Sequence, residues 1–208
     1  MKKFTKYILF ISLGLLCSCS DYLDIVPDNV TTLDIVFNNK NTAQRYLANC
    51  YHFVPDHGSV KRIPGMGAGH ECWFYTDKDS YFDNEVSFYI ARGLQNTNAP
   101  YANYWDGEGG SKLPMFRAIR ECNIFLSYVR DQHKVNDLTD SERKRWIAEV
   151  NVLKAYYHFF LFEHYGPIPI VDEALPVSTS SEGVKVTRMP VDQVVDLSLI
   201  NISEPKRP

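Results

Sequence analysis

The stretch that decides the fold runs from Thr139 to Pro167 and reads TDSERKRWIAEVNVLKAYYHFFLFEHYGP. Its first four residues form a capping box, in which the Thr139 hydroxyl and the Glu142 carboxylate each satisfy a backbone amide that a helix start leaves unpaired. Gly166 can adopt a positive φ after the last turn, and Pro167 prevents continuation. The sequence therefore predicts a helix down to Tyr165. Its apolar face is expected to contain Trp146, Val150, Leu153, Tyr157, Phe160 and Leu161, with His164 beside them.

A second helical pattern begins near residue 41. Apolar side chains recur at spacings of four, three and four, which places them on one face of a helix. We expect Asn41 to cap this helix and Pro55 to end it, so the prediction is a helix over 41–53. The residues on its buried face are Ala43, Leu47, Cys50 and Val54.

A third helix is predicted over 112–131, with Ser111 as a possible cap and Pro114 in the first turn, where proline is tolerated. Its buried face contains Met115, Ile119, Cys122, Leu126 and Val129. A polar loop joins it to the helix that ends at Tyr165, and two antiparallel helices would bury both apolar faces. The fold class we expect is mostly α, built from helical hairpins with long loops.

The remaining segments have no sustained periodicity. Residues 55–100 are rich in Gly, Asp, Asn and aromatic residues, and we expect long loops with short helical or extended pieces there. Residues 168–171 are apolar and suit a short strand or an extended arm, and 178–183 suit a loop. Pro190 is expected to open one more helix, through Val195.

The N-terminus carries an export signal. Three lysines within the first six residues precede an apolar run over 7–16, which is half the length of about 20 residues that a helix needs to cross a bilayer. The sequence Leu16-Cys17-Ser18-Cys19 that follows resembles a bacterial lipobox, so we expect cleavage after residue 18 and lipidation of Cys19. The alternative is an ordinary secretory signal.

Composition excludes several classes. The chain has 208 residues, 45% of them hydrophobic, so it can form a core without disulfides. With 22 basic and 25 acidic residues and no basic block beyond the signal, a nucleic-acid partner is not expected. Cys50, Cys72 and Cys122 lack metal-ligand spacing and are interpreted as buried free thiols. No catalytic or cofactor-binding motif is recognisable, and no cofactor or metal is predicted.

Aromatic residues interleave with Asp and Asn between residues 73 and 85. A pyranose presents an apolar face to an aromatic ring and hydroxyl groups to polar side chains, so this mixture suits a sugar site on surface loops. The candidate ligand-binding residues are Trp73, Tyr75, Tyr81 and Phe82. For any one ring, packing against the core is the alternative, and Trp105 and Trp146 are expected in the core. The acidic run 77–85 is a weaker calcium candidate, because Phe82 replaces the turn glycine.

Several motifs together resemble the N-terminal part of the SusD/RagB family of outer-membrane nutrient-binding lipoproteins. They are CSDYLD at 19–24, residues 41–51, Trp105, IRECNIFL at 119–126, EVNVLKAYY at 149–157 and YGPIP at 165–169. The family's usual arginine before the Ala-Tyr-Tyr sequence is Lys154 here.

The resemblance implies a scaffold related to tetratricopeptide repeats, and a position at the outer membrane of a Gram-negative bacterium, lipid-anchored and facing the exterior. It also implies oligosaccharide binding as a lid on a SusC-type TonB-dependent transporter. The expected organisation is a signal peptide (1–18), a lipidated tether (19–40) and the N-terminal part of the helical domain (41–196). No ligand-contacting residue of the family can be transferred to this chain.

Three alternatives to glycan delivery remain: a surface glycoside hydrolase, a peptide-binding protein and a structural surface lipoprotein. A hydrolase needs two carboxylates about 5–9.5 Å apart, and the sequence identifies no such pair. Residues 197–208 resemble the translation of a transposase adaptor used in sequencing libraries, so we expect them to be an artefact that truncates a longer protein.

Overall fold

The structure is a computed structural model, and it describes residues 32–59, 63–65, 67–69, 86–108, 112–176, 179–180 and 182–196. The chain divides into a unit of Met1–Leu33 and a unit of Asp34–Pro208. The helices of the described residues are α2 (Leu33–Val36), α3 (Lys40–Tyr51), α4 (Val86–Ala91), α5 (Met115–Arg130) and α6 (Asp140–Tyr165). Residues 191–196 are also helical, and the described residues contain no strand.

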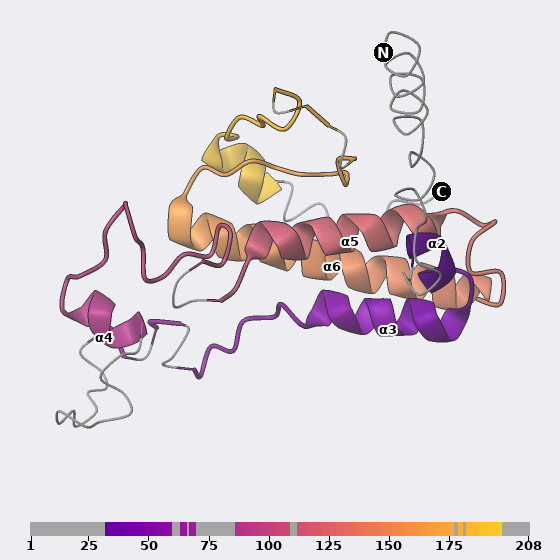
Figure 1. The fold of residues 1–208 in the computed structure, drawn as a ribbon, viewed down its shortest axis with the longest axis horizontal. Coiled ribbons are helices and arrows are strands. Elements are labelled where there is room, and N and C mark those ends of the chain that lie inside the picture. The colour runs from indigo at the N-terminus through magenta and orange to yellow at the C-terminus, as the bar shows by residue number, and fades with distance from the viewer. Residues whose placement is uncertain are drawn as a thin grey trace, which may run out of the picture. The chain divides into compact units, whose positions relative to one another are not determined.

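Three of these helices form the scaffold. α5 and α6 are joined by residues 131–139 into an antiparallel hairpin, and α3 packs against both (Figure 1). The helical-hairpin fold class predicted from the sequence is confirmed. Because α6 carries apolar residues on most of its circumference, it can be buried against several neighbours at once. It contacts α3, α5 and the chain that follows Tyr165.

The start of α6 is as predicted. The Thr139 hydroxyl accepts a hydrogen bond from the Glu142 amide, and the Glu142 carboxylate accepts one from the Thr139 amide. Gly166 ends the helix with φ 67°, which a side chain would disfavour. The six apolar residues predicted for the buried face are all buried. His164 is largely exposed, but its ring packs 4.4 Å from the Phe160 ring.

The start and end of α3 differ from the prediction. Asn39, not Asn41, is the N-cap: its backbone is extended (φ −144°, ψ 161°) and its side chain accepts from the Thr42 amide. The helix ends at Tyr51, before Pro55, and Val54 is therefore off the helical face and 41% exposed. Phe53 is buried instead. Part of the predicted tether is also structured, because 33–36 are helical and Phe37 is buried.

α5 begins at Met115, with Pro114 at the N-cap and no side-chain cap, and all five residues predicted for its apolar face are buried. Ser111 lies outside the described residues. The arm predicted over 168–171 is extended without a strand, and the helix predicted after Pro190 is present. The loops predicted between 55 and 100 contain α4 among the residues that are described.

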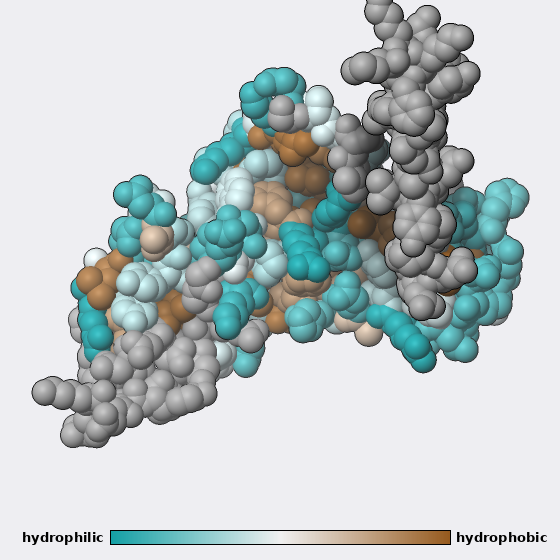
Figure 2. All heavy atoms as spheres, viewed as in Figure 1, coloured by the Kyte–Doolittle hydropathy of each residue, from teal (hydrophilic) through white to brown (hydrophobic). Residues whose placement is uncertain are grey.

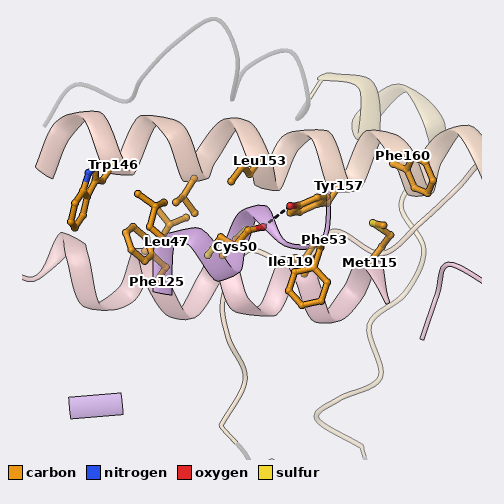
Figure 3. Packing of buried hydrophobic residues seen from close by; sticks show 14 of the residues in the cluster. Leu47, Cys50, Phe53, Met115, Ile119, Phe125, Trp146, Leu153, Tyr157 and Phe160 are labelled. Carbon is orange, nitrogen blue, oxygen red and sulfur yellow. Dashed lines mark hydrogen bonds between the residues drawn. The ribbon is translucent and has the colours of Figure 1, made fainter. Parts of the chain in front are cut away.

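The core lies between α3, α5 and α6 (Figure 3). Phe125 of α5 packs against Phe37 and Trp146, with ring centroids 5.9 and 6.2 Å away. The Tyr157 hydroxyl of α6 donates to the Cys50 carbonyl at the end of α3, where helical carbonyls lack intrahelical partners. Trp146 and the thiols of Cys50 and Cys122 are buried, as predicted, whereas Cys72 lies outside the described residues.

The loop between α5 and α6 is organised by one buried cation. The Arg143 guanidinium donates to the carbonyls of Val129, Asp131, Lys134 and Val135, at 2.6–3.2 Å. Val135 has φ 50°, a strained conformation for a β-branched residue. We infer that the Arg143 contacts hold the loop in this conformation.

Candidate ligand-binding groove

None of the site residues predicted from the sequence can be placed. Cys19, Trp73, Tyr75, Tyr81 and Phe82 lie outside the described residues. The calcium candidate over 77–85 lies there too. The candidate site must therefore be sought elsewhere in the described part of the chain.

A groove of about 480 Å³ lies between α5, the segment before it that contains Trp105, and residues 169–186 after α6 (Figure 2). In Figure 2, hydrophobic residues gather between α5 and the C-terminal loop, with hydrophilic residues around them. Its apolar lining consists of Trp105, Phe116, Pro169, Val171, Ala174, Leu175, Pro176, Val184 and Val186. Its polar lining includes Arg120, Glu173, Thr179 and Lys185. Aromatic and aliphatic surface with a few polar groups is typical of small-molecule sites.

Trp105 is the principal aromatic residue of this groove. It was expected in the core, and it is half-buried: Phe116 lies 4.6 Å from it and the edge of Tyr165 lies 5.5 Å from it, measured between ring centroids. The Arg188 guanidinium lies 5.1 Å from the Trp105 ring centroid, a cation–π distance. The indole is thus fixed by its neighbours, while part of it lines the groove.

One wall of the groove is the arm, which we define as residues 168–176. In Figure 1 it runs back over the α5–α6 hairpin from the end of α6. Arg120 of α5 donates to the Leu175 carbonyl at 2.7 Å, and Asn123 donates to the Val171 carbonyl at 2.9 Å. Because these carbonyls are bonded to the helix, the arm has a defined position along α5.

The arm is also bonded to α6 through two buried polar residues. Lys154 Nζ donates to the carbonyl and to Oδ1 of Asp172, both at 3.1 Å. The His158 ring accepts from the Val171 amide at 3.4 Å. Burial lowers the pKa of Lys154, although the nearby Asp172 carboxylate opposes that shift, and burial lowers the pKa of His158 to about 4.

A second hollow, of about 560 Å³, lies between residues 34–38 and 133–136. Its aromatic lining residue, Phe37, is completely buried and stacks 4.5 Å from Tyr128. The lining thus has no exposed Phe, Tyr or Trp ring, and its exposed ring is the smaller imidazole of His133. For this reason we regard the groove beside Trp105 as the better candidate.

A further aromatic pair follows the predicted ligand-binding residues 73–82 in sequence. Tyr89 of α4 and Tyr101 stack with ring centroids 4.1 Å apart. Gln95 accepts from the Tyr101 and Ala102 amides, which ties the polar loop after α4 to this pair.

The sequence interpretation missed the groove because it forms from segments that are distant along the chain. No sequence pattern links Arg120, Glu173 and Lys185. They come together because the chain after α6 folds back over α5. In the described part of the chain, no group of His, Cys, Asp and Glu side chains could hold a metal ion. None of the described helices is long and apolar enough to cross a membrane.

Comparison with known proteins gives consistent results. Residues 21–202 match a SusD-like family described as "Starch-binding associating with outer membrane". The chain is 22% identical over 216 residues to the SusD-like protein P38 of Formosa agariphila, across 100% of this chain and 38% of that protein. The chain thus spans well under half the length of this relative.

Two solved structures share the fold. One is of BT4246, with a TM-score of 0.58 and 24% identity, covering 78% of this chain and 25% of that one. The other is a SusD-like protein (BF3747) from Bacteroides fragilis NCTC 9343, with a TM-score of 0.52 and 16% identity, covering 86% and 30%.

Proposed function

Because the chain belongs to the SusD-like family, which matches residues 21–202, we propose that it is a surface lipoprotein that binds oligosaccharides. The observation that carries the proposal is the groove in which Trp105 is held beside Arg120, Glu173 and Lys185. A fixed aromatic ring suits the apolar face of a sugar, and charged or hydroxyl side chains nearby suit its hydroxyl groups. Trp73, Tyr75, Tyr81 and Phe82 stay candidates for additional contacts.

The proposal extends to location and partner. Cys19, lipidated at its thiol and made the N-terminal residue by removal of residues 1–18, would anchor the protein to the outer membrane, where it faces the cell exterior. Two or more acyl chains give a stable anchor, since each buried methylene contributes about 0.8 kcal/mol. A SusC-type TonB-dependent transporter would receive the bound glycan. Family membership supports both parts of this proposal.

Binding is tested with purified protein and a panel of oligosaccharides and peptides, by calorimetric titration and by chromatography of the same mixtures. We expect saturable heat with at least one oligosaccharide and no change in its length. Product release in the absence of any other protein would contradict the binding function and favour the hydrolase alternative. Saturation with peptides alone would favour the peptide-binding alternative.

Anchoring and partnership need separate tests. Cells grown with an alkyne fatty acid should label the native protein, and Cys19→Ser should abolish the label while Cys17→Ser retains it. The anchored protein should co-purify from detergent-solubilised outer membranes with a transporter of the TonB-dependent class. Labelling that survives in the Cys19→Ser variant would contradict the anchor assignment.

A further inference from the structure

Two buried polar residues of α6, Lys154 and His158, have no part in the apolar core, yet they are 7% and 1% exposed. Buried cationic and imidazole groups are costly unless they are hydrogen-bonded. Both direct their bonds to the same short piece of the arm, Val171 and Asp172. They lie one turn apart on α6, so they face the arm together.

The hydrogen bonds of His158 define its tautomer. Its Nδ1 is 2.8 Å from the Lys154 carbonyl, which can only accept, so Nδ1 carries the proton. Nε2 is then an acceptor, as the Val171 amide requires. A protonated ring would present a donor to that amide and place a second positive charge near Lys154.

The two helices of the hairpin hold the two backbone polar groups of the same residue, Val171. Asn123 of α5 bonds the Val171 carbonyl, while His158 of α6 bonds the Val171 amide. Lys154 then fixes the next residue at its carbonyl and its carboxylate. The Lys154 bonds, at 3.1 Å and with a charged donor, are stronger than the 3.4 Å bond to His158.

We propose that Lys154 and His158 are positioning residues of the ligand groove, which set the place of one of its walls by fixing the arm at Val171 and Asp172. The inference rests on the proposed function of the groove. The arm contributes Pro169, Val171 and residues 173–176 to the lining, whereas Lys154, His158 and Asp172 are outside it. A change at any of these three can therefore alter ligand affinity only through the arm.

The test compares Lys154→Met with Lys154→Arg in the full chain. We expect the amides of residues 170–175 to exchange hydrogen about tenfold faster in Lys154→Met, since losing bonds worth about 1.4 kcal/mol gives that factor. The α5 amides should not change. Affinity for the best oligosaccharide of the panel should fall by a similar factor. Lys154→Arg, which keeps the charge and the donors, should restore both.

Two further variants guard against general destabilisation. Asp172→Ala removes a side chain that is 66% exposed, so it cannot disrupt the core, and it should speed arm exchange severalfold. Leu153→Ala, a change at a neighbouring core residue, should lower the stability of the fold. It should leave the ratio of amide hydrogen exchange in the arm to that in α5 unchanged. If it loosens the arm as much as Lys154→Met does, the positioning role is wrong.

The remaining outcomes separate this inference from the proposed function. Unchanged arm exchange in Lys154→Met would overturn the inference and leave glycan binding intact. Loosened exchange with unchanged affinity would also overturn it, because the arm would not form part of the binding site. Absence of oligosaccharide binding by the unmodified chain would instead overturn the proposed function, and the exchange data would still decide whether Lys154 holds the arm.

Discussion

The three-helix core includes α6 and the arm packs against it, but different interactions hold the core and the arm. The core is held by the packing of buried aromatic rings. Phe125 lies between Phe37 and Trp146, and each of the three is at most 3% exposed. The arm buries Ile168 and Pro169, accepts a backbone hydrogen bond from the Met189 amide at Ile168, and is also held by side-chain hydrogen bonds from α5 and α6. Apolar packing is insensitive to pH, whereas the bond between the Val171 amide and His158 requires a neutral imidazole. The comparison therefore predicts a stable scaffold that carries an adjustable groove wall.

The largest effect is expected in the core. Phe125→Ala should lower the free energy of unfolding by about 3–5 kcal/mol, because it removes a completely buried ring and leaves a cavity. Urea denaturation measures the loss. Phe159→Ala is the control, since Phe159 is 42% exposed on α6 and its removal should cost less than about 1 kcal/mol. Equal losses in the two variants would contradict the core assignment.

Arg143 should have the next largest effect, on the loop that joins α5 and α6. Arg143→Met keeps most of the aliphatic stem but removes the donors to four backbone carbonyls, so we expect a loss of about 3 kcal/mol in the free energy of unfolding. Hydrogen exchange should increase over residues 131–138. Arg145→Met, on an exposed part of the same helix, should be nearly neutral. A neutral Arg143→Met variant would show that the loop conformation does not depend on this cation.

The stability of the fold should depend on pH through His158, which accepts a hydrogen bond from the arm. The pKa of His158 is about 4 in the folded chain and 6.5 in the ordinary, unfolded state. The unfolded chain therefore binds more protons between these values, and stability is full above pH 6.5 and falls as the pH drops to 4. One pKa unit corresponds to about 1.4 kcal/mol, which bounds the loss near 3 kcal/mol. Denaturation of the wild-type chain and of His158→Gln at several pH values measures this, and identical slopes would contradict the assignment.

The smallest effect is expected at the start of α6. Thr139→Ala removes the capping hydroxyl and should cost about 1 kcal/mol in the free energy of unfolding. Ser141→Ala, within the first turn and exposed, is the matched control and should change stability little. The carboxylate of Glu142 contributes as well, since its hydrogen bonds with Lys40 and Thr139 lower its pKa to about 2. A Thr139→Ala variant as stable as Ser141→Ala would argue against the capping box.

The sequence predicted the scaffold because its helices are specified locally. The capping box at Thr139, the glycine at 166 and the apolar spacing on α5 and α6 are all short-range signals, and each was confirmed. The predicted cap of α3 was wrong because Asn39 and Asn41 are the same residue type, which is favoured at the N-cap. Only the extended backbone of Asn39 identifies it as the cap. Val54 was wrongly placed for a related reason, since nothing local marks Tyr51 as the last helical residue.

The groove was not predictable by the same reasoning. In the sequence, Lys154 and His158 look like polar interruptions of an apolar face, and only the folded-back arm supplies their hydrogen-bond partners. The sequence around Trp105 does not show whether its ring packs in the core or lines a surface. In the structure the ring packs against Phe116 and also lines the groove. The candidates at residues 73–82 stay predictions.

The central claim is that the groove beside Trp105 binds oligosaccharide, and the most direct measurement is a calorimetric titration of two tryptophan variants. Trp105→Leu keeps apolar bulk but removes the flat ring, while Trp146→Phe changes a core ring remote from the groove. We predict that Trp105→Leu raises the Kd at least about tenfold, roughly 1.4 kcal/mol, and that Trp146→Phe leaves it unchanged. Wild-type affinity in Trp105→Leu would contradict the claim.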